Sequence, residues 1–256
     1  MTLYDKIIFG PIKSRRLGLS LGVNLLPIDA KICTFNCIYC ECGFNTTMHE
    51  SPIPTRQQVK ETLKAKLKEM VFENQIPDVI TFAGNGEPTL HPDFDGIIDD
   101  TIELRNDICP TAKVSVLSNS TRIHKSYVFK ALNKVDNNIL KFDSAIDRTM
   151  KLMNCPVGTH INVNWLIENL KKFEGKLIIQ TMFLSGVYKG EPFDNTTDEE
   201  VEAWLRALKE IRPQKVMIYS LDREAPTESL QKISVEELNI IAEKARLSGF
   251  DVSVAG

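Results

Sequence analysis

Short apolar segments rich in β-branched residues alternate with amphipathic segments along most of this 256-residue chain. The apolar segments are typical of strands buried in a parallel sheet, and the amphipathic ones have the spacing of surface helices. Strands that alternate with helices form right-handed βα units, and ligands gather at the carboxyl ends of their strands. The alternation therefore predicts an α/β fold in which a curved parallel sheet carries helices on its outer face.

The individual elements can be placed by their apolar spacing and by capping signals. Strands are expected at residues 23–27, 78–83, 113–117, 139–144, 177–184, 215–220 and 251–254. Three helices should begin at capping boxes, in which Ser or Thr precedes Gln or Glu by three positions. These boxes are Thr55 with Gln58, Thr197 with Glu200 and Ser234 with Glu237. Further helices are expected after Pro92 and over 125–132 and 161–173.

Length and composition limit the domain organisation and the class of protein. One α/β barrel can take up 256 residues, and 43% hydrophobic residues supply a sizeable core, so a single domain over 1–256 is predicted. Its core should cover about 20–222, followed by a C-terminal helix and short strand over 223–256. The net charge of −3 does not indicate a nucleic-acid or anionic-membrane partner. With no membrane-length apolar run and no secretion signal at its start, a cytoplasmic protein is expected.

Three cysteines with the spacing CxxxCxxC follow the first predicted strand, at Cys33, Cys37 and Cys40. Clustered cysteines in a reducing compartment favour metal binding or catalysis over disulfides. Thiolates hold iron-sulfur clusters, and a cubane takes four of them, so a three-cysteine loop leaves one iron open. Alternatively, Cys42 could complete a four-ligand zinc site, although zinc sites more often join two separate cysteine pairs. A non-catalytic iron-sulfur or zinc module is thus one of the open hypotheses.

The cysteine spacing, with the aromatic Tyr39 directly before the last cysteine, resembles the signature of the radical S-adenosylmethionine (SAM) superfamily. The resemblance implies a partial (β/α)6 barrel and a 4Fe-4S cluster on Cys33, Cys37 and Cys40, with Tyr39 beside the cofactor. In that family the open iron binds the amine and carboxylate of SAM, and an electron from the cluster produces a 5'-deoxyadenosyl radical that abstracts hydrogen from a substrate. An external electron donor such as flavodoxin or ferredoxin is also implied.

A glycine-rich segment, Gly84-Asn85-Gly86-Glu87, follows the second predicted strand. Glycine lets a backbone approach a ligand closely, although by itself this segment favours an ordinary strand-to-helix turn. Beside the cysteines it resembles the GGEP element of radical SAM enzymes, with Asn85 inserted. The resemblance implies that Gly84, Gly86 and Glu87 receive the SAM amine, and Asn85 is counted with them in the cofactor-binding set.

Lys141 and Asp143 lie on one face of a predicted strand. Burying their charges is costly unless they pair or meet a polar ligand, so they form either an ion pair or a cofactor contact. The resemblance implies contact with the SAM ribose. Lys141 is also a candidate catalytic residue, because a buried lysine with a lowered pKa can form a Schiff base with a keto acid.

Two further strands carry predicted cofactor contacts. Gln180 and Met182 share one face of their strand, where the superfamily meets ribose and adenine. Ser118 and Asn119 end the third central strand and are candidates for binding the SAM carboxylate.

Several other residues have two interpretations each. Cys155 follows a strand end, where its thiol could donate hydrogen to a substrate radical or have no role. Arg223 could clamp an anionic substrate or form a surface salt bridge. Cys42 is interpreted as a neighbouring thiol and Cys109 as inert.

Three segments, Gly10–Gly18, Gly84–Pro92 and Tyr219–Arg223, resemble a bacterial branch near the wyosine-synthase-type enzymes. Those enzymes modify transfer RNA, so a transfer-RNA substrate that contacts Arg15 and Arg16 is an alternative to a small molecule or peptide. The archaeal members carry a further cluster on upstream cysteines, whereas residues 1–32 contain none here.

Overall fold

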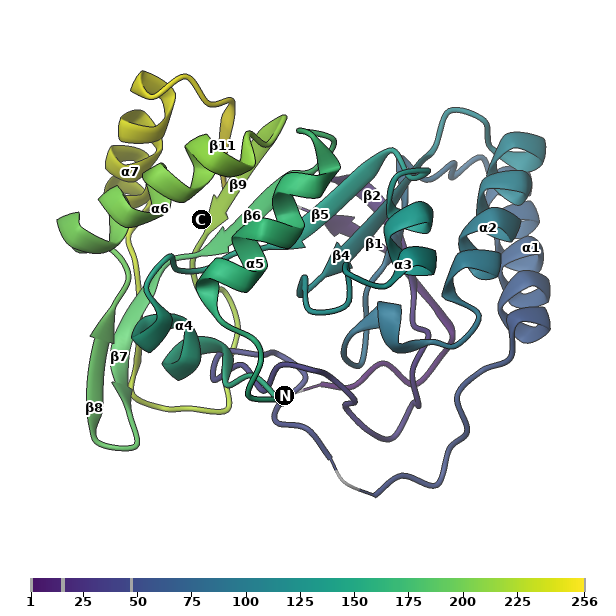
Figure 1. Cartoon of the computed structure of the whole chain (residues 1–256). Coiled ribbons are helices and arrows are strands. Elements are labelled where there is room, and N and C mark those ends of the chain that lie inside the picture. Colours follow the sequence, from purple (N-terminus) through teal and green to yellow (C-terminus); the bar gives the residue numbers. More distant parts are fainter. Residues whose placement is uncertain (1, 15–16, 47, 256) are drawn as a thin grey trace.

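A curved eight-stranded sheet forms the centre of the computed structural model, which describes residues 2–14, 17–46 and 48–255. The strand order is β1-β2-β3-β4-β5-β6-β9-β11, and every neighbouring pair is parallel except the antiparallel pair β1 and β2. The strands are β1 (Ile8–Ser14), β2 (Gly18–Val23), β3 (Val79–Phe82), β4 (Lys113–Ser118), β5 (Asn137–Lys141), β6 (Ile178–Met182), β9 (Lys215–Tyr219) and β11 (Val252–Ala255). The sheet curls into a half-barrel, which confirms the predicted fold class (Figure 1).

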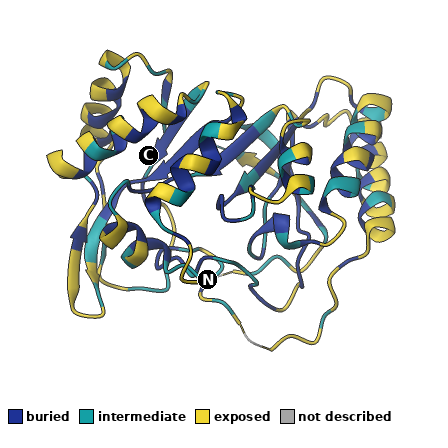
Figure 2. Cartoon of the chain, in the orientation of Figure 1, coloured by how far each residue is buried: buried dark blue, intermediate teal, exposed yellow. Residues whose placement is uncertain are grey.

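Helices connect the parallel strands and cover the outer face of the sheet (Figure 1). They are α1 (Arg56–Phe72), α2 (Phe94–Ile108), α3 (Ser126–Leu132), α4 (Asp147–Asn154), α5 (Val163–Leu170), α6 (Asp198–Ile211) and α7 (Val235–Leu247), with short 3-10 helices at Pro88–Leu90 and Lys171–Phe173. Their inner sides are buried and their outer sides exposed, as Figure 2 shows, and α1 buries the predicted stripe of Val59, Leu63, Leu67 and Met70. No helix in the described part of the chain is long and apolar enough to cross a membrane.

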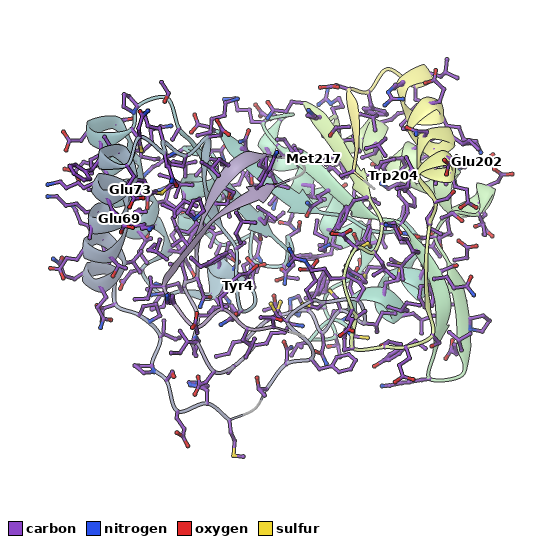
Figure 3. The ribbon with its side chains drawn as sticks, turned by 180° about the vertical axis from the view of Figure 1, so that it is seen from behind. Tyr4, Glu69, Glu73, Glu202, Trp204 and Met217 are labelled. Carbon is purple, nitrogen blue, oxygen red and sulfur yellow. The ribbon has the colours of Figure 1, made fainter. Side chains whose placement is uncertain are left out.

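The two faces of the sheet carry different apolar clusters, because successive side chains of a strand point to opposite sides. The large core lies between the sheet and the helices, where the Trp204 ring stands edge-on to Phe183 at 5.4 Å between ring centroids. On the inner face Ile139, Ile178 and Met217 form a smaller cluster, against which Leu17 packs from the turn before β2. Seen from behind in Figure 3, the β1–β2 hairpin leans over this face toward Met217.

The capping predictions are confirmed at two of three helices. Thr55 and Ser234 form reciprocal capping boxes with Gln58 and Glu237. Thr197 accepts a hydrogen bond from the backbone of Glu200, but the Glu200 side chain does not return it. That carboxylate turns inward and accepts a hydrogen bond from Ser144 at 2.7 Å, so the third box is incomplete.

The first predicted strand was wrong in position, since β2 ends at Val23 where 23–27 was expected to begin. Asn24 turns the chain there, because its side chain bonds both the N–H and the carbonyl of Leu26, at 3.2 and 2.9 Å. The strand itself was hidden by its glycines. Gly22 is needed because a Cβ would lie 2.2 Å from the Phe9 ring of β1.

Some elements were missed or merged. The helix α4 was not predicted, and the segment 161–173 divides into α5 and a 3-10 turn. A second sheet of β7 (Leu184–Tyr188), β8 (Glu191–Asp194) and β10 (Leu230–Lys232) was also missed, although Lys189 and Gly190 make a tight turn with positive φ between β7 and β8. Both β1 and β11 lie outside the predicted core of 20–222 yet join the main sheet. The single-domain reading of 1–256 stays a prediction.

Candidate active site at the carboxyl end of the half-barrel

The cysteine loop follows β2 and docks against the glycine-rich segment that follows β3. The N–H of Ile32 donates to the carbonyl of Asn85 at 3.0 Å, and the N–H of Glu87 donates to the carbonyl of Ile32 at 3.1 Å. Ile32 and Gly86 thereby form an isolated parallel bridge. Two motifs that the sequence places about fifty positions apart are therefore joined by backbone hydrogen bonds at one end of the sheet.

Both glycines of this segment make room for the protein's own chain. Gly86 has φ +135°, and a Cβ there would lie 1.8 Å from the carbonyl oxygen of Ile32. Gly84 has φ +139°, and its Cβ would lie 2.6 Å from Oδ1 of Asn24. The close approach that these glycines permit is thus made by the cysteine loop and the turn after β2, and the contact of these glycines with SAM stays a prediction.

The side chain of Asn85 bonds the protein's own backbone, and the predicted contact of this residue with a cofactor stays a prediction. It is fully buried, and its side chain bonds the backbone of Tyr4 in both directions, at 2.8 and 2.9 Å, and the carbonyl of Pro27 at 2.9 Å. The inserted residue therefore holds the N-terminal segment and the start of the cysteine loop against the end of β3.

The carboxylate of Glu87 connects the glycine-rich segment to the end of β4. It is buried, and it accepts hydrogen bonds from the Thr89 hydroxyl at 2.6 Å, the Ser118 hydroxyl at 2.9 Å and the Asn119 N–H at 2.7 Å. Burial raises the pKa of Glu87, while the hydrogen bonds from Asn119, Thr89 and Ser118 act against that rise. Three residues predicted as cofactor contacts thus lie within one hydrogen-bond network.

Cys37 is buried, Cys33 and Cys40 are partly buried, and the sulfurs of Cys33 and Cys37 lie close to amide nitrogen donors. Nδ2 of Asn119 donates to Sγ of Cys33 at 3.3 Å, and Nδ2 of Asn154 lies 3.6 Å from Sγ of Cys37. Burial raises the pKa of Cys33 to about 12 and that of Cys37 to about 11, because a thiolate without a cation is poorly solvated there. A bound metal centre would supply that positive charge, and thiolates ligate metals in their deprotonated form.

Tyr39, the aromatic residue before Cys40, is held by the end of β5. Its hydroxyl donates to the carboxylate of Asp143, and Nδ2 of Asn154 donates to both, at 2.8 Å to Tyr39 and 2.7 Å to Asp143. Burial, and then the charge of Asp143, raise the pKa of Tyr39 well above its ordinary value. Asn154 was not predicted. In the sequence it is marked only by its place directly before Cys155. In the structure it is the last residue of α4, and Cys155 after it has φ 42°, in the left-handed region.

Lys141 points into the concave face between two aromatic rings. Its ammonium lies 5.0 Å from the centre of the Tyr39 ring and 5.6 Å from that of Tyr219, donates to the Tyr219 hydroxyl at 3.1 Å, and lies 3.5 Å from Asp143. Burial by itself would lower the pKa of Lys141, but the negative charge of Asp143 leads the effects that raise it above its ordinary value. Asp143 thus favours the charged ammonium and forms the predicted ion pair with Lys141, whereas a catalytic role of Lys141 stays a prediction.

Gln180 and Met182 lie on the same face of the sheet as Lys141. Gln180 is the register partner of Lys141 on the neighbouring strand, and Met182 is the partner of Tyr219 on β9. The backbone N–H of Met182 also donates to Asp143 at 2.9 Å. Strand register thus gathers the residues predicted to meet ribose and adenine at one part of the inner face. Their contact with a cofactor stays a prediction.

Two of the remaining thiols lie near the cysteine loop. Sγ of Cys42 lies 3.4 Å from the carbonyl oxygen of Gly84, and a hydrogen bond from the Cys42 thiol lowers the pKa of Cys40 to about 6. Cys155 donates to the carbonyl of Leu152 at 3.4 Å, and burial raises its pKa. Cys109 is buried in the helix-side core.

Arg223 does not act as a free anion clamp. It forms an ion pair with Glu41 at 2.8 Å, and both side chains are at least half exposed. This ion pair matches the surface salt bridge, which was one of the two interpretations of Arg223. Arg15 and Arg16, on which the RNA hypothesis depended, lie outside the described residues.

The three thiols of Cys33, Cys37 and Cys40 suit a 4Fe-4S cubane better than a single metal ion. Within the described part of the chain, no three His, Cys, Asp or Glu side chains are grouped closely enough to hold one metal ion. A cubane instead takes one thiolate on each of several irons, and its thiolates consequently lie further apart. Three thiols on one loop, two of which accept a hydrogen bond from an amide nitrogen, suit such a cluster.

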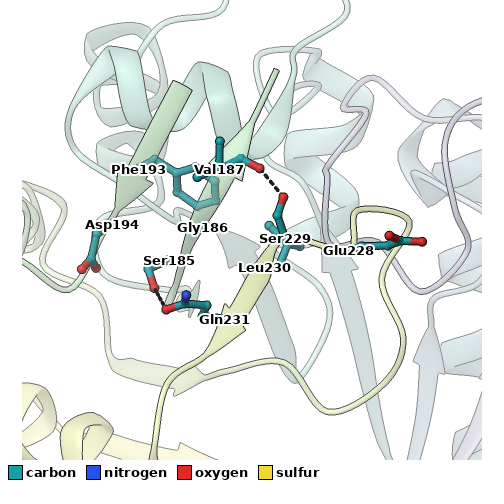
Figure 4. Close-up of a pocket in the computed structure, with 9 residues that line it drawn as sticks. All are labelled: Ser185, Gly186, Val187, Phe193, Asp194, Glu228, Ser229, Leu230 and Gln231. Atoms are coloured by element: carbon teal, nitrogen blue, oxygen red, sulfur yellow. Dashed lines mark hydrogen bonds between the residues drawn. The ribbon is translucent and has the colours of Figure 1, made fainter. Parts of the chain in front are cut away.

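Two cavities lie away from these residues. One of about 720 Å³ is lined by the first residues of several strands, Val79, Lys113, Ile178 and Lys215 among them, at the opposite end of the half-barrel. The other, of about 490 Å³, lies on the small sheet of β7, β8 and β10 (Figure 4). Neither is lined by a predicted site residue.

A parallel half-barrel with a cysteine loop at the carboxyl end of its first parallel strand defines a class of iron-sulfur proteins, and sequence comparison agrees. The profile of the Radical SAM superfamily matches residues 28–198. A UPF0026 protein of Helicobacter pylori is 32% identical over 244 residues, with 91% of this chain and 71% of that protein covered. The chain belongs to the radical SAM superfamily, whose members use a 4Fe-4S cluster and SAM, and within it groups with the UPF0026 proteins.

Other similarities cover smaller parts of longer proteins. The GTPase Obg of Brachyspira hyodysenteriae is 30% identical over 239 residues, which are 92% of this chain but 33% of that protein. This chain contains no GxxxxGK[ST] sequence, so nothing in it matches a nucleotide-binding P-loop.

Solved structures share the fold at low identity. A radical SAM methyltransferase from Sphaerobacter thermophilus superposes with a TM-score of 0.67 at 14% identity, over 92% of this chain and 65% of that one. A TYW1 with a lysine-pyruvate adduct bound superposes with a TM-score of 0.61 at 14% identity, over 89% and 73%.

Proposed function

We propose that this chain is a radical SAM enzyme in which Cys33, Cys37 and Cys40 hold a 4Fe-4S cluster with one iron left open for SAM. When bound, the cluster supplies the electron that cleaves SAM to methionine and a 5'-deoxyadenosyl radical. The observation that supports this most is the docking of the cysteine loop on the segment of Gly84 to Glu87, because it brings both cofactor motifs to the same strand ends.

The chain's own residues would position SAM through hydrogen bonds and charges. Oε2 of Glu87 accepts from the Asn119 N–H and keeps acceptor capacity for the SAM amine. The Asn119 amide donates to Cys33 and, at 2.8 Å, to the Thr34 hydroxyl, and it would exchange one of these bonds to meet the carboxylate of SAM. Lys141 and Gln180 present polar groups on the concave face, where the ribose would lie.

The proposal is compatible with three substrate classes, which are a small molecule, a peptide and RNA. One TYW1 structure is described with a lysine-pyruvate adduct bound. Such an adduct is disfavoured at Lys141, because its formation needs a neutral amine and Asp143 favours the charged one. An RNA substrate predicts affinity that falls steeply with salt and collapses in an Arg15→Ala, Arg16→Ala variant. The proposal also includes a reducing, cytoplasmic setting and an external donor such as flavodoxin or ferredoxin.

The test is anaerobic reconstitution with iron and sulfide, followed by dithionite and SAM. The wild-type protein should bind a cluster and release 5'-deoxyadenosine, and Cys33→Ala, Cys37→Ala and Cys40→Ala should each lose both properties. Cys109→Ala is the matched control, because it removes a buried thiol from the helix-side core. A wild-type protein that carries its full cluster content and releases no 5'-deoxyadenosine would refute the proposed enzyme activity.

The non-catalytic zinc or iron-sulfur module makes a different prediction about Cys42. If Cys42 completes a four-ligand site, Cys42→Ala should lose metal as fully as Cys40→Ala. The radical SAM proposal expects Cys42→Ala to keep its iron, because SAM takes the fourth position.

A further inference from the structure

Two of the three proposed cluster ligands accept a hydrogen bond from a side-chain nitrogen, because Asn119 donates to Cys33 and Asn154 to Cys37, as described above. The third side-chain donor of this loop is Lys31, which lies two positions before Cys33 and whose ammonium bonds the turn after Cys40. Of the three donors, Lys31 is the one that carries a full charge. No motif predicted it, since a lysine two positions before the first cysteine reads as an ordinary loop residue.

Lys31 is buried to a degree that is rare for a lysine, with 2% of its surface exposed. Its ammonium donates to the carbonyl of Gly43 at 2.7 Å, in the turn that closes the cysteine loop. Among the described residues no carboxylate lies within ion-pair distance of it. A buried ammonium costs several kcal/mol unless an opposite charge compensates it.

The groups that surround Lys31 indicate where that opposite charge is. Gly43, whose carbonyl accepts from the ammonium, donates its own N–H to the carbonyl of Cys40 at 2.8 Å, so the charge of Lys31 lies against the cysteine loop. The thiolates of a bound cluster are the negative charges within reach. Adding an electron to that cluster makes the site more negative, and a fixed positive charge beside it stabilises the reduced form.

We propose that Lys31 is a positioning residue that raises the reduction potential of the cluster, as the buried counter-charge of the cysteine loop, with Asn119 and Asn154 as weaker, neutral donors. This rests on the proposed function, because it needs the cluster on Cys33, Cys37 and Cys40. Hydrogen bonds and charges near cluster sulfurs are known determinants of such potentials. A charge close to a low-dielectric site should act more strongly than an amide dipole.

The experiment is a redox titration of the reconstituted protein without SAM, followed by the electron paramagnetic resonance signal of the reduced cluster. Lys31→Met and Lys31→Gln should each lower the equilibrium constant for reduction at least tenfold, which is about 59 mV for a one-electron couple. Lys31→Gln keeps a donor without the charge, and Lys31→Arg keeps the charge and should stay close to wild type. Asn119→Ala should shift the potential in the same direction by less.

The outcomes separate the possible roles of Lys31. Wild-type potentials in both neutral variants would overturn the proposal. If those variants also bound SAM more weakly, the result would assign Lys31 to the carboxylate of SAM. Should both neutral variants fail to retain iron, retention by Lys31→Arg still supports the counter-charge, and loss in all three overturns it. The titration does not depend on SAM cleavage, so failure of the proposed enzyme activity is a separate result.

Discussion

The hydroxyl of Tyr39 donates a hydrogen bond to the carboxylate of Asp143, which lies 104 positions later in the chain. Both side chains are buried, and the bond fastens the last part of the cysteine loop to the end of β5. Asn154, at the end of α4, completes the contact by donating to both groups. The position of Cys40 therefore depends on a strand and a helix distant in sequence.

Tyr39→Phe should lower the free energy of unfolding by about 1–3 kcal/mol, because it leaves a buried carboxylate with one donor fewer. Urea denaturation of the apo protein measures this. Tyr127→Phe is the control, since it removes a half-buried hydroxyl whose partner is the side chain of Arg122. A Tyr39→Phe cost no larger than the control's would show that the bond does not stabilise the loop.

Lys141→Met should destabilise the fold more than the double variant Lys141→Met, Asp143→Asn. The single change leaves Asp143 as a buried charge without its cation, which typically costs about 3–5 kcal/mol, whereas the double change removes both charges. A double-mutant cycle by chemical denaturation isolates the coupling. Additive costs would mean that the 3.5 Å ion pair contributes nothing.

Gly86→Ala should prevent the cysteine loop from docking, because the new Cβ would lie 1.8 Å from the Ile32 carbonyl oxygen. We expect iron content after reconstitution to fall severalfold. Gly190→Ala is the matched control: its φ is also positive, at +82°, but a Cβ there meets nothing within 4 Å. It should cost about 1–2 kcal/mol of backbone strain and keep its iron. Equal iron loss in both variants would contradict the close approach at Gly86.

Acid should weaken the contact between α1 and α2 through Asp100. Hydrogen bonds from Arg56, at 2.6 Å, and Lys60, at 3.0 Å, hold the pKa of Asp100 below its ordinary value. A lowered folded-state pKa gives stability that is present above the unfolded value of about 4 and is lost as pH falls through the folded value. The wild type should therefore exceed Asp100→Asn in stability at pH 7, and the difference should disappear in strong acid.

Urea midpoints from pH 7 to pH 2 measure that difference. Asp107→Asn, which removes an exposed carboxylate from the same helix, should show no comparable pH-dependent gap. A constant gap between wild type and Asp100→Asn over the whole range would contradict the linkage.

Local sequence was sufficient for much of the fold and for the proposed metal ligands. The apolar stripe of α1 and the capping boxes at Thr55 and Ser234 act within a few residues, so spacing predicts them directly. The three cysteines could be found in the same way, since four and three positions separate them on one loop.

Tertiary structure decided what surrounds those cysteines. Asn119 and Asn154 approach the sulfurs because the ends of β4 and α4 bring them there, and neither spacing nor composition reports such contacts. The same holds for Gly86, whose missing side chain accommodates the Ile32 carbonyl. Periodicity records which face of an element is apolar, whereas the charge around a buried thiolate depends on residues far apart in the chain that meet after folding.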